Sequence, residues 1–213
     1  MASNYDSSAG FYDWLSRLVY GNAPIKAQQY LLPLIPANAH VLIIGGGTGR
    51  IIEDIAVVHP SGLHITYVEL SAKMTVLSQK RNAAGNTITF INNAVENVNM
   101  PQHFDVVITP FLLDNYTDEK LSPTFKHIDS LLKPGALWLD TDFQLTGKWW
   151  QWLLLNSMIV FFKLLKSIDS TKLPDARKLF TDYGYTVVDE KEFYGRFMVT
   201  RGYRKKTHKI TSN

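Results

Sequence analysis

The chain has 213 residues, of which 46% are hydrophobic, and its formal net charge is +3. This length and composition predict one globular domain with a sizeable core. The sequence contains no cysteine, which excludes a disulfide framework, a thiol nucleophile and a thiolate metal site. The mild net charge does not predict a large nucleic-acid surface.

The sequence carries no targeting signal and no metal-binding pattern. Residues Met1 to Asp6 lack the basic and apolar stretch of a signal peptide, and the lack of cysteine is compatible with a reducing cytoplasm. The histidines include no His-x-x-x-His pair, so we expect no catalytic metal. We therefore expect a cytoplasmic protein whose partners do not include nucleic acid.

Two helices are predicted before the first strand, one over residues 11–20 and one over Pro24–Leu32. The strand Val41–Ile44 then runs into four glycines within five positions, and a helix follows over Ile51–Val58. A continuous apolar strand predicts burial on both faces of a parallel sheet. Glycines at its end let the backbone turn sharply and approach a ligand closely. An ordinary glycine turn without a ligand is the alternative.

The spacing of these glycines narrows the choice of ligand. A dinucleotide fingerprint requires a third glycine where Ile52 stands, and a phosphate-binding loop requires Lys and Ser or Thr where Arg50 and Ile51 stand. The next predicted strand, His64–Glu69, ends on an acid twenty residues after Gly49. A carboxylate at that strand end is expected to accept hydrogen bonds from a ribose. A solvated acid at a strand end is the alternative.

The rest of the chain continues the alternation of helices and strands. Ser71 caps a predicted helix that runs through Ala84, and a predicted turn at Asn92 and Asn93 follows the third strand. Further elements are expected as strands over Thr87–Ile91, Phe104–Ile108 and Ala136–Asp140, a helix over Asp175–Tyr183, and two strands, Tyr185–Glu192 and Arg196–Tyr203, joined at Gly195.

This series of motifs, from Val41 to Asp142, resembles the class I S-adenosylmethionine-dependent methyltransferases. The pattern Gly45-x-Gly47-x-Gly49 is similar to motif I of that family, and Asn93-Ala94 stands where the family usually has Asp-Ala facing the adenine. The resemblance implies a Rossmann-like α/β fold. Its sheet is expected to have seven mostly parallel strands with an antiparallel last strand, and helices on both faces.

The resemblance also implies a cofactor, S-adenosyl-L-methionine, and a set of residues around it. The implied cofactor-binding residues are Gly45, Gly46, Gly47, Thr48, Gly49, Glu69, Leu70, Ser71, Met74, Asn93, Ala94, Val95, Thr109, Pro110 and Phe111. A Tyr-Asp pair at Tyr12 is similar to the leader of the small-molecule branch that serves ubiquinone and menaquinone biosynthesis. Tyr12 is therefore a candidate substrate-binding residue, and packing of an aromatic helix on the sheet edge is the alternative.

The chain departs from the family pattern in two ways. Ile43 stands where the family commonly has an acid, and the triple glycine also resembles aminopropyltransferases of the spermidine synthase type. Those enzymes continue with Asp where Thr48 stands, and they need an acid after the fourth strand, where Thr109-Pro110 offers none. An aminopropyltransferase and a non-catalytic module that binds S-adenosylmethionine both stay open. The Asn-Pro-Pro-Tyr element of DNA amino-methyltransferases is absent.

The segment Trp149–Leu165 is apolar nearly all round, but it is too short and too often interrupted by polar residues to span a membrane. As a helix it is expected to pack Trp149, Leu153, Met158, Phe162 and Leu165 on the domain. The remainder, which includes Trp152, Leu155 and Ile159, then faces a substrate, a partner subunit or a lipid surface. We interpret the segment as a hydrophobic lid, with Trp149 and Trp152 as substrate-binding residues. A helix buried beneath the C-terminal segments is the alternative.

These patterns predict methyl transfer to a small, apolar acceptor that resembles a lipid or quinone. If a general base is needed, the candidates after strand ends are Asp114, Tyr116, His127 and Asp142. We favour Asp114, whose alternative role is to cap a helix ahead of Thr117. The single domain then divides into a helical leader (1–38), a cofactor-binding core (39–142), the lid (143–172), a closing helix and hairpin (173–204) and a basic tail (205–213). Oligomerisation is open.

Overall fold

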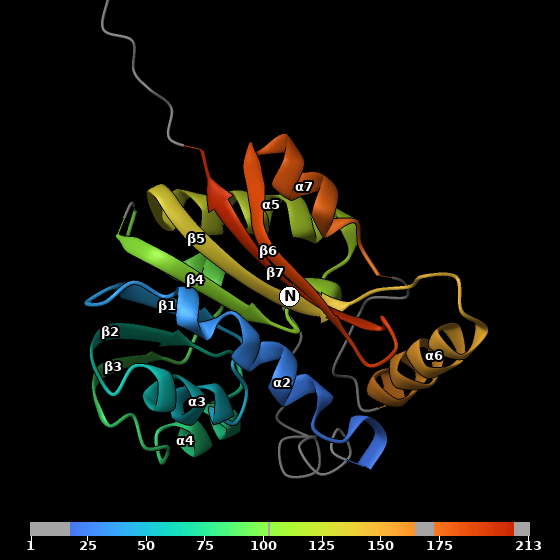
Figure 1. Cartoon of the computed structure of the whole chain (residues 1–213), viewed down its shortest axis with the longest axis horizontal. Coiled ribbons are helices and arrows are strands. Elements are labelled where there is room, and N and C mark those ends of the chain that lie inside the picture. The colour runs from blue at the N-terminus through green and yellow to red at the C-terminus, as the bar shows by residue number, and fades with distance from the viewer. Residues whose placement is uncertain (1–17, 102, 165–172, 207–213) are drawn as a thin grey trace, which may run out of the picture.

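The structure is a computed structural model that describes residues 18–101, 103–164 and 173–206. One sheet of seven strands organises it, in the order β3-β2-β1-β4-β5-β7-β6 (Figure 1). The strands are β1 His40–Ile44, β2 Ser61–Val68, β3 Gly85–Ile91, β4 Phe104–Pro110, β5 Leu132–Phe143, β6 Tyr185–Phe193 and β7 Met198–Lys205.

The strand directions match the expected sheet. β1 pairs in parallel with β2 and β4, and β7 is antiparallel to both of its neighbours, β5 and β6. The chain leaves β1 for β2 on one side and later returns to place β4 on the other side. The strand order therefore reverses between β1 and β4, which is where open α/β sheets bind ligands beyond the carboxyl ends of their strands.

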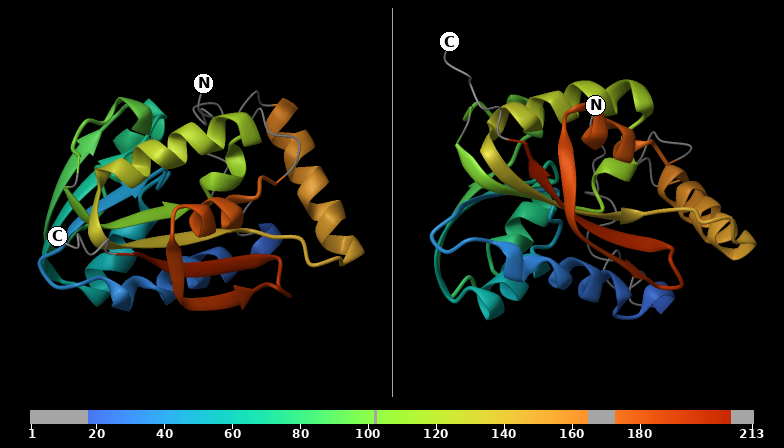
Figure 2. Two further views of the ribbon diagram at one scale, coloured as in Figure 1. Left: turned by 90° about the horizontal axis from the view of Figure 1, so that it is seen from above. Right: turned by 45° about the horizontal axis from the view of Figure 1, so that its top comes forward.

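Helices cover both faces of the sheet (Figures 1 and 2). The described helices are α2 Ala23–Tyr30, α3 Arg50–Val58, α4 Ala72–Ser78, α5 Asp118–Leu131, α6 Trp149–Leu164 and α7 Ala176–Asp182, with short 3-10 turns η1 Leu32–Leu34, η2 Val95–Asn97 and η3 Leu113–Asn115. α5 and α7 lie on one face, and α2, α3 and α4 lie on the other.

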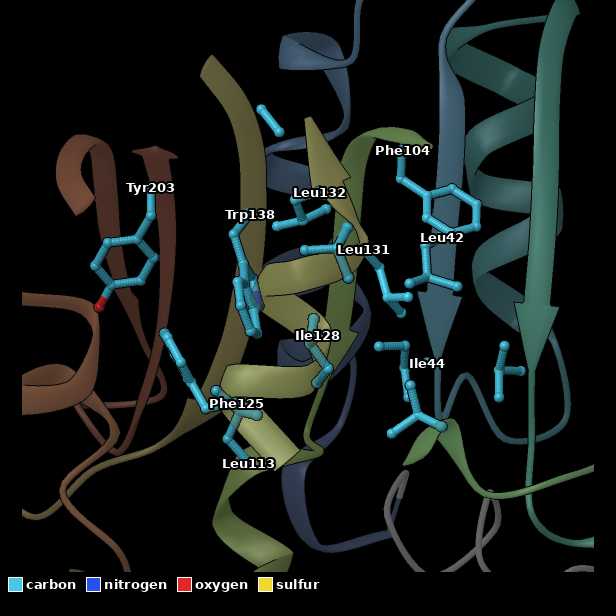
Figure 3. Close-up of a cluster of buried hydrophobic side chains, with 14 of the residues drawn as sticks. Leu42, Ile44, Phe104, Leu113, Phe125, Ile128, Leu131, Leu132, Trp138 and Tyr203 are labelled. Atoms are coloured by element: carbon cyan, nitrogen blue, oxygen red, sulfur yellow. The ribbon is translucent and has the colours of Figure 1, made fainter. Parts of the chain in front are cut away.

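Each face has its own apolar core, because alternate residues of a central strand point to opposite sides. Leu42 and Ile44 of β1 join Phe125 of α5 and Trp138 of β5 on one face, as Figure 3 shows. Val41 and Ile43 join the isoleucines of α3 on the other face. The continuous apolar run of β1 therefore does lie buried on both faces, as predicted.

Several elements differ from the predicted bounds. α4 ends at Ser78 instead of continuing through Ala84, whose φ of 53° is left-handed and therefore not helical. β5 begins at Leu132, before the Lys-Pro-Gly turn that was expected to precede it. β7 begins at Met198, because the hairpin turn occupies the four residues before it, and Gly195 lies in that turn with a φ of 58°.

The packing face predicted for α6 is wrong at Trp149, Leu153 and Leu155 and right at Met158. Leu155 is buried against Phe197 and Met198 at the end of the last hairpin, and Leu154, Met158 and Ile159 pack beside it. The two residues expected to pack at the start of the helix, Trp149 and Leu153, are 77% and 54% exposed. The helix is apolar nearly all round, so its sequence has no polar stripe that marks the solvent side.

Of the predicted leader, the second helix is present as α2 and η1. Residues 18–20 are helical, and the rest of the first helix, including Tyr12, lies outside the described residues. The same holds for residues 165–172 of the predicted lid and for residues 207–213 of the basic tail.

Candidate functional site

The loop after β1 has the backbone of a glycine turn. Gly45, Gly47 and Gly49 have φ values of 67°, 60° and 81°, which residues with a Cβ rarely adopt. The amide of Gly45 donates to the carbonyl of Val68 at the end of β2, over 2.9 Å. The turn therefore stays joined to the neighbouring strand while it leads into α3.

Gly46 is required for a different reason, namely close approach. A Cβ at Gly46 would lie 2.5 Å from the hydroxyl of Tyr67 and 2.7 Å from two of its ring carbons. The same hydroxyl donates to the carbonyl of Gly47 over 2.9 Å. Tyr67, which is buried on β2, therefore packs against the loop and restrains the position of its backbone.

Glu69 lies beside this loop, as the sequence predicted. Its Oε2 accepts from the amide of Gly47 at 3.0 Å, and its Oε1 accepts from the amide of Ser71 at 2.9 Å. The side chain is 6% exposed, so it is not the solvated acid of the alternative interpretation. The carboxylate therefore ties the glycine loop to the end of β2.

Two residues that the sequence analysis missed hold this arrangement together. Arg81 donates from Nε to the carbonyl of Thr48 at 2.9 Å and pairs with Glu53 at 3.3 Å. Asn92 donates from Nδ2 to the carbonyls of Glu69 and Leu70, at 2.8 Å and 3.0 Å. Both connect segments that lie far apart in sequence, which a local pattern does not reveal.

The third expected element, after β3, lies at the same edge of the sheet. Oδ1 of Asn93 accepts from the amide of Ala94 and from Asn97, each at 2.8 Å. The carbonyl of this amide is thus engaged locally at the start of η2. Val95 is buried in the core, and so is Met74 on α4, whose sulfur lies 3.6 Å from where a Cβ of Gly47 would stand.

The backbone that follows β4 is strained where it turns towards the site. Thr109 is fully buried, and its hydroxyl donates to Oδ1 of Asp140 at 2.7 Å and accepts from Nε1 of Trp138. Phe111 has a φ of 52°, and its amide donates to the carbonyl of Thr141. The chain therefore changes direction sharply after Pro110, before Asp114.

Asp114 does not cap α5, because the helix begins after Thr117 and its N-cap makes no side-chain bond. Its amide instead donates to Oδ2 of Asp142 at 3.2 Å. Burial raises the pKa of Asp114 to about 6 and that of Asp140 to about 7. Burial, together with the charges of the other two acids, raises the pKa of Asp142 as well. Three carboxyl groups therefore gather at the carboxyl ends of β4 and β5.

The other two base candidates are engaged elsewhere. Burial and the charge of Glu96 raise the pKa of Tyr116, which packs in the core beneath α5. The Nε2 atom of His127 is 2.9 Å from the carbonyl of Val98. Neither side chain meets the carboxyl cluster through a hydrogen bond that the structure records, so their catalytic role stays a prediction.

The predicted substrate residues on α6 are largely exposed to solvent. Trp149 is 77% exposed and Trp152 is 61% exposed, and α6 stands beside the sheet end rather than over a face (Figures 1 and 2). Within the described ranges, no helix is long and apolar enough to cross a membrane. Those residues also contain no cluster of three or more His, Asp or Glu side chains suited to a metal ion.

Comparison with known families agrees with this geometry. Residues 41–135 match a family model described as a methyltransferase domain. This part of the chain is therefore similar to methyltransferase domains. Because β1 to the start of β5, with the glycine loop and Glu69, lie inside the match, the resemblance to the class I S-adenosylmethionine-dependent methyltransferases is confirmed.

The chain is also similar to two curated proteins. A ubiquinone/menaquinone biosynthesis C-methyltransferase from Geotalea daltonii is 28% identical, over 62% of this chain and 58% of that protein. A non-reducing polyketide synthase from Emericella nidulans is 26% identical, over 62% of this chain and 6% of that protein. The chain therefore spans just over half of one relative and a small part of the other.

Solved methyltransferases share the fold. The 1,6-didemethyltoxoflavin-N1-methyltransferase of Burkholderia thailandensis, with bound acceptor and S-adenosylhomocysteine, gives a TM-score of 0.67 at 18% identity, over 94% of this chain and 86% of that chain. Magnesium protoporphyrin IX methyltransferase from Synechocystis gives 0.65 at 19% identity, over 95% and 97%. At these identities the likeness establishes the Rossmann-like fold.

Proposed function

We propose that the chain transfers a methyl group from S-adenosylmethionine to a small, apolar acceptor. The observation that carries this proposal is the 3.0 Å hydrogen bond between the amide of Gly47 and the carboxylate of Glu69. It brings the glycine turn and the acid at the neighbouring strand end to one place, beside the point where the strand order reverses. A single adenosyl compound can contact both.

The residues at this edge fit such a cofactor. Gly46 and Gly47 present backbone without Cβ atoms, and the carboxylate of Glu69, which contacts Gly47, is the proposed acceptor for the ribose hydroxyls. Asn93 is the candidate to contact the adenine edge. Its local hydrogen bonds use Oδ1, so the contact would be made through Nδ2. Ile43 is fully buried in the core, so the amino-acid end of the cofactor must rely on groups other than a carboxylate at that position.

The cofactor supplies an activated methyl group on a sulfonium. The protein then has to align the acceptor with that methyl group and exclude water, and positioning of this kind contributes up to about 7–11 kcal/mol in model systems. The carboxyl ends of β4 and β5, with Phe111 and Phe143 in contact at 5.1 Å between ring centroids, are the proposed acceptor side. An apolar acceptor suits these rings.

Titration calorimetry with S-adenosylmethionine and S-adenosylhomocysteine tests the proposal. Glu69→Ala removes the ribose acceptor and the bond that holds Gly47, so we expect about tenfold weaker binding or more, the value of one lost charge-assisted hydrogen bond. Glu119→Gln, which changes an exposed acid at the start of α5, is the control and should bind normally. Unchanged affinity of Glu69→Ala would remove the ribose assignment.

The same titration separates the alternative functions. Preference for decarboxylated S-adenosylmethionine would indicate an aminopropyltransferase. Tight binding without methyl release to any acceptor in a lipid or quinol extract would indicate a non-catalytic module. We propose the methyltransferase because Thr109, the residue at the end of β4, is used internally to bind Asp140 and Trp138, and Pro110 offers no acid.

The exposed side of α6 supports a further partner. Trp149, Trp152, Leu153 and Val160 are all more than half exposed and recur at helical spacing along one side. Lys163 lies near the end of the same side. Tryptophan and lysine together favour the interface of an anionic membrane. We propose peripheral lipid contact through this side of α6, in a cytoplasmic protein.

A further inference from the structure

The carboxyl ends of β4 and β5 hold an acidic cluster of two buried members and one half-buried member, which cofactor binding does not explain. Asp140 and Asp142 are on the same face of β5 and are 4% and 8% exposed. Asp114 follows β4 in η3 and is in direct contact with Asp142. Buried carboxyl groups are costly unless they are paired or protonated, so each of the three needs an account.

Asp140 is accounted for by its neighbours. It accepts a hydrogen bond from Thr109, and the positive charge of Arg201 on β7 acts on it from the adjacent strand. Arg201 is itself held by Glu190 and by Gln144. This part of the cluster therefore stabilises the edge between β5 and β7.

Asp114 and Asp142 form a pair. The amide of Asp114 donates to Oδ2 of Asp142 at 3.2 Å. Nδ2 of Asn115 donates to Oδ1 of Asp114 at 3.0 Å. Burial and the neighbouring charge of Asp114 raise the pKa of Asp142. Like charges this close disfavour ionisation of both groups, so the pair favours a state with one proton and one negative charge.

One atom of this pair lacks a partner. Oδ1 of Asp142 is buried and has no hydrogen bond from any of the described residues, although the other oxygen of the same carboxyl group is satisfied. Buried acceptors are rarely left unpaired in folded proteins, because the loss of hydration is not compensated. The atom lies where the ends of β4 and β5 meet, on the proposed acceptor side of the site.

Resting on the proposed function, we infer that Oδ1 of Asp142 binds a hydroxyl or amine group of the methyl acceptor and takes its proton. The acceptor's electron pair forms the new bond to the methyl carbon while the carbon–sulfur bond breaks, and the electrons of that bond remain on sulfur. The proton leaves the acceptor for Oδ1 of Asp142, and the proton already held by the pair moves onto Asp114. Asp142 is then the catalytic residue and Asp114 a positioning residue.

The environment suits a base of this kind. Burial raises the pKa of Asp114 to about 6, and burial with the charges of Asp114 and Asp140 raises the pKa of Asp142. A carboxylate with a raised pKa is a stronger base than a solvated one, and a base is most effective when its pKa is near the working pH. The charged groups that face the pair are Asp140 on β5 and, through Asp140, Arg201 on β7.

The inference is tested by binding, which needs no turnover. The probes are 1-naphthol, which has a hydroxyl group, and 1-methoxynaphthalene, which has the same ring without a proton to donate. Each is titrated calorimetrically into the protein saturated with S-adenosylhomocysteine. We expect the wild type to prefer 1-naphthol by about tenfold or more, the value of a hydrogen bond to a charged group, and to prefer it less as the pH falls below about 6 and the pair takes a second proton.

Asp142→Asn should abolish the preference while S-adenosylhomocysteine still binds normally, and Glu119→Gln should retain it. In Asp114→Asn the preference should persist to lower pH, because removal of the neighbouring carboxylate lowers the pKa of Asp142, a change that a purely structural role would not cause. Equal or absent binding of the two probes by the wild type, or a preserved preference in Asp142→Asn, would overturn the inference. If S-adenosylhomocysteine itself fails to bind, the proposed function fails, and the two probes are compared on the free protein.

Discussion

The contact between Gly46 and Tyr67 yields the most quantitative prediction. Gly46→Ala places a methyl group 2.5 Å from the Tyr67 hydroxyl and 2.7 Å from its ring, closer than carbon atoms approach without displacement. Overpacking of this kind costs about 1–3 kcal/mol, and displacement of Tyr67 also breaks its bond to the carbonyl of Gly47, worth about 0.5–1.5 kcal/mol. We expect the free energy of unfolding to fall by about 2–4 kcal/mol.

Urea unfolding measures this change, and a double-mutant cycle identifies its cause. Tyr67→Leu removes the ring that the new methyl group would contact, so the two substitutions together should cost about 1–2 kcal/mol less than the sum of the single costs. Gly147→Ala serves as a comparison for backbone strain without overpacking, because a Cβ there meets nothing within 4 Å but the φ of Gly147 is 83°. Strictly additive costs at Gly46 and Tyr67 would refute the close-approach argument.

Two further predictions concern the acidic cluster and α6. Because burial raises the pKa of Asp114 to about 6 and that of Asp140 to about 7, the folded protein binds more protons than the unfolded chain between about pH 4 and 7, and the free energy of unfolding should fall as the pH rises through that window. Asp142→Asn should make this fall shallower in urea titrations, and an equal fall in both proteins would contradict the assignment. Replacing Trp149 and Trp152 by Ala should reduce cosedimentation with phosphatidylserine vesicles. The control Val187→Ala, which changes an exposed residue of β6, should not reduce it. Equal binding by the wild type, the double variant and the control would exclude the lipid contact.

The sequence by itself determined the elements and their order. The apolar run of β1, the glycines after it and the acid that ends the next strand are local patterns, and the structure keeps each of them in the predicted place. The seven mostly parallel strands and the antiparallel β7 were implied by the family resemblance, and the sheet confirms them. Local periodicity is enough for these features because backbone geometry and strand burial act over a few residues.

Tertiary structure decided how distant side chains meet. The support of Gly46 by Tyr67 and the bond from Arg81 to Thr48 join residues 21 and 33 positions apart, and parallel pairing brings their segments together. The pairing of Asp114 with Asp142 arises because β4 and β5 end side by side. The packing side of α6 was also decided by the tertiary structure. A helix that is apolar nearly all round buries whichever side meets complementary partners, which here are Phe197 and Met198.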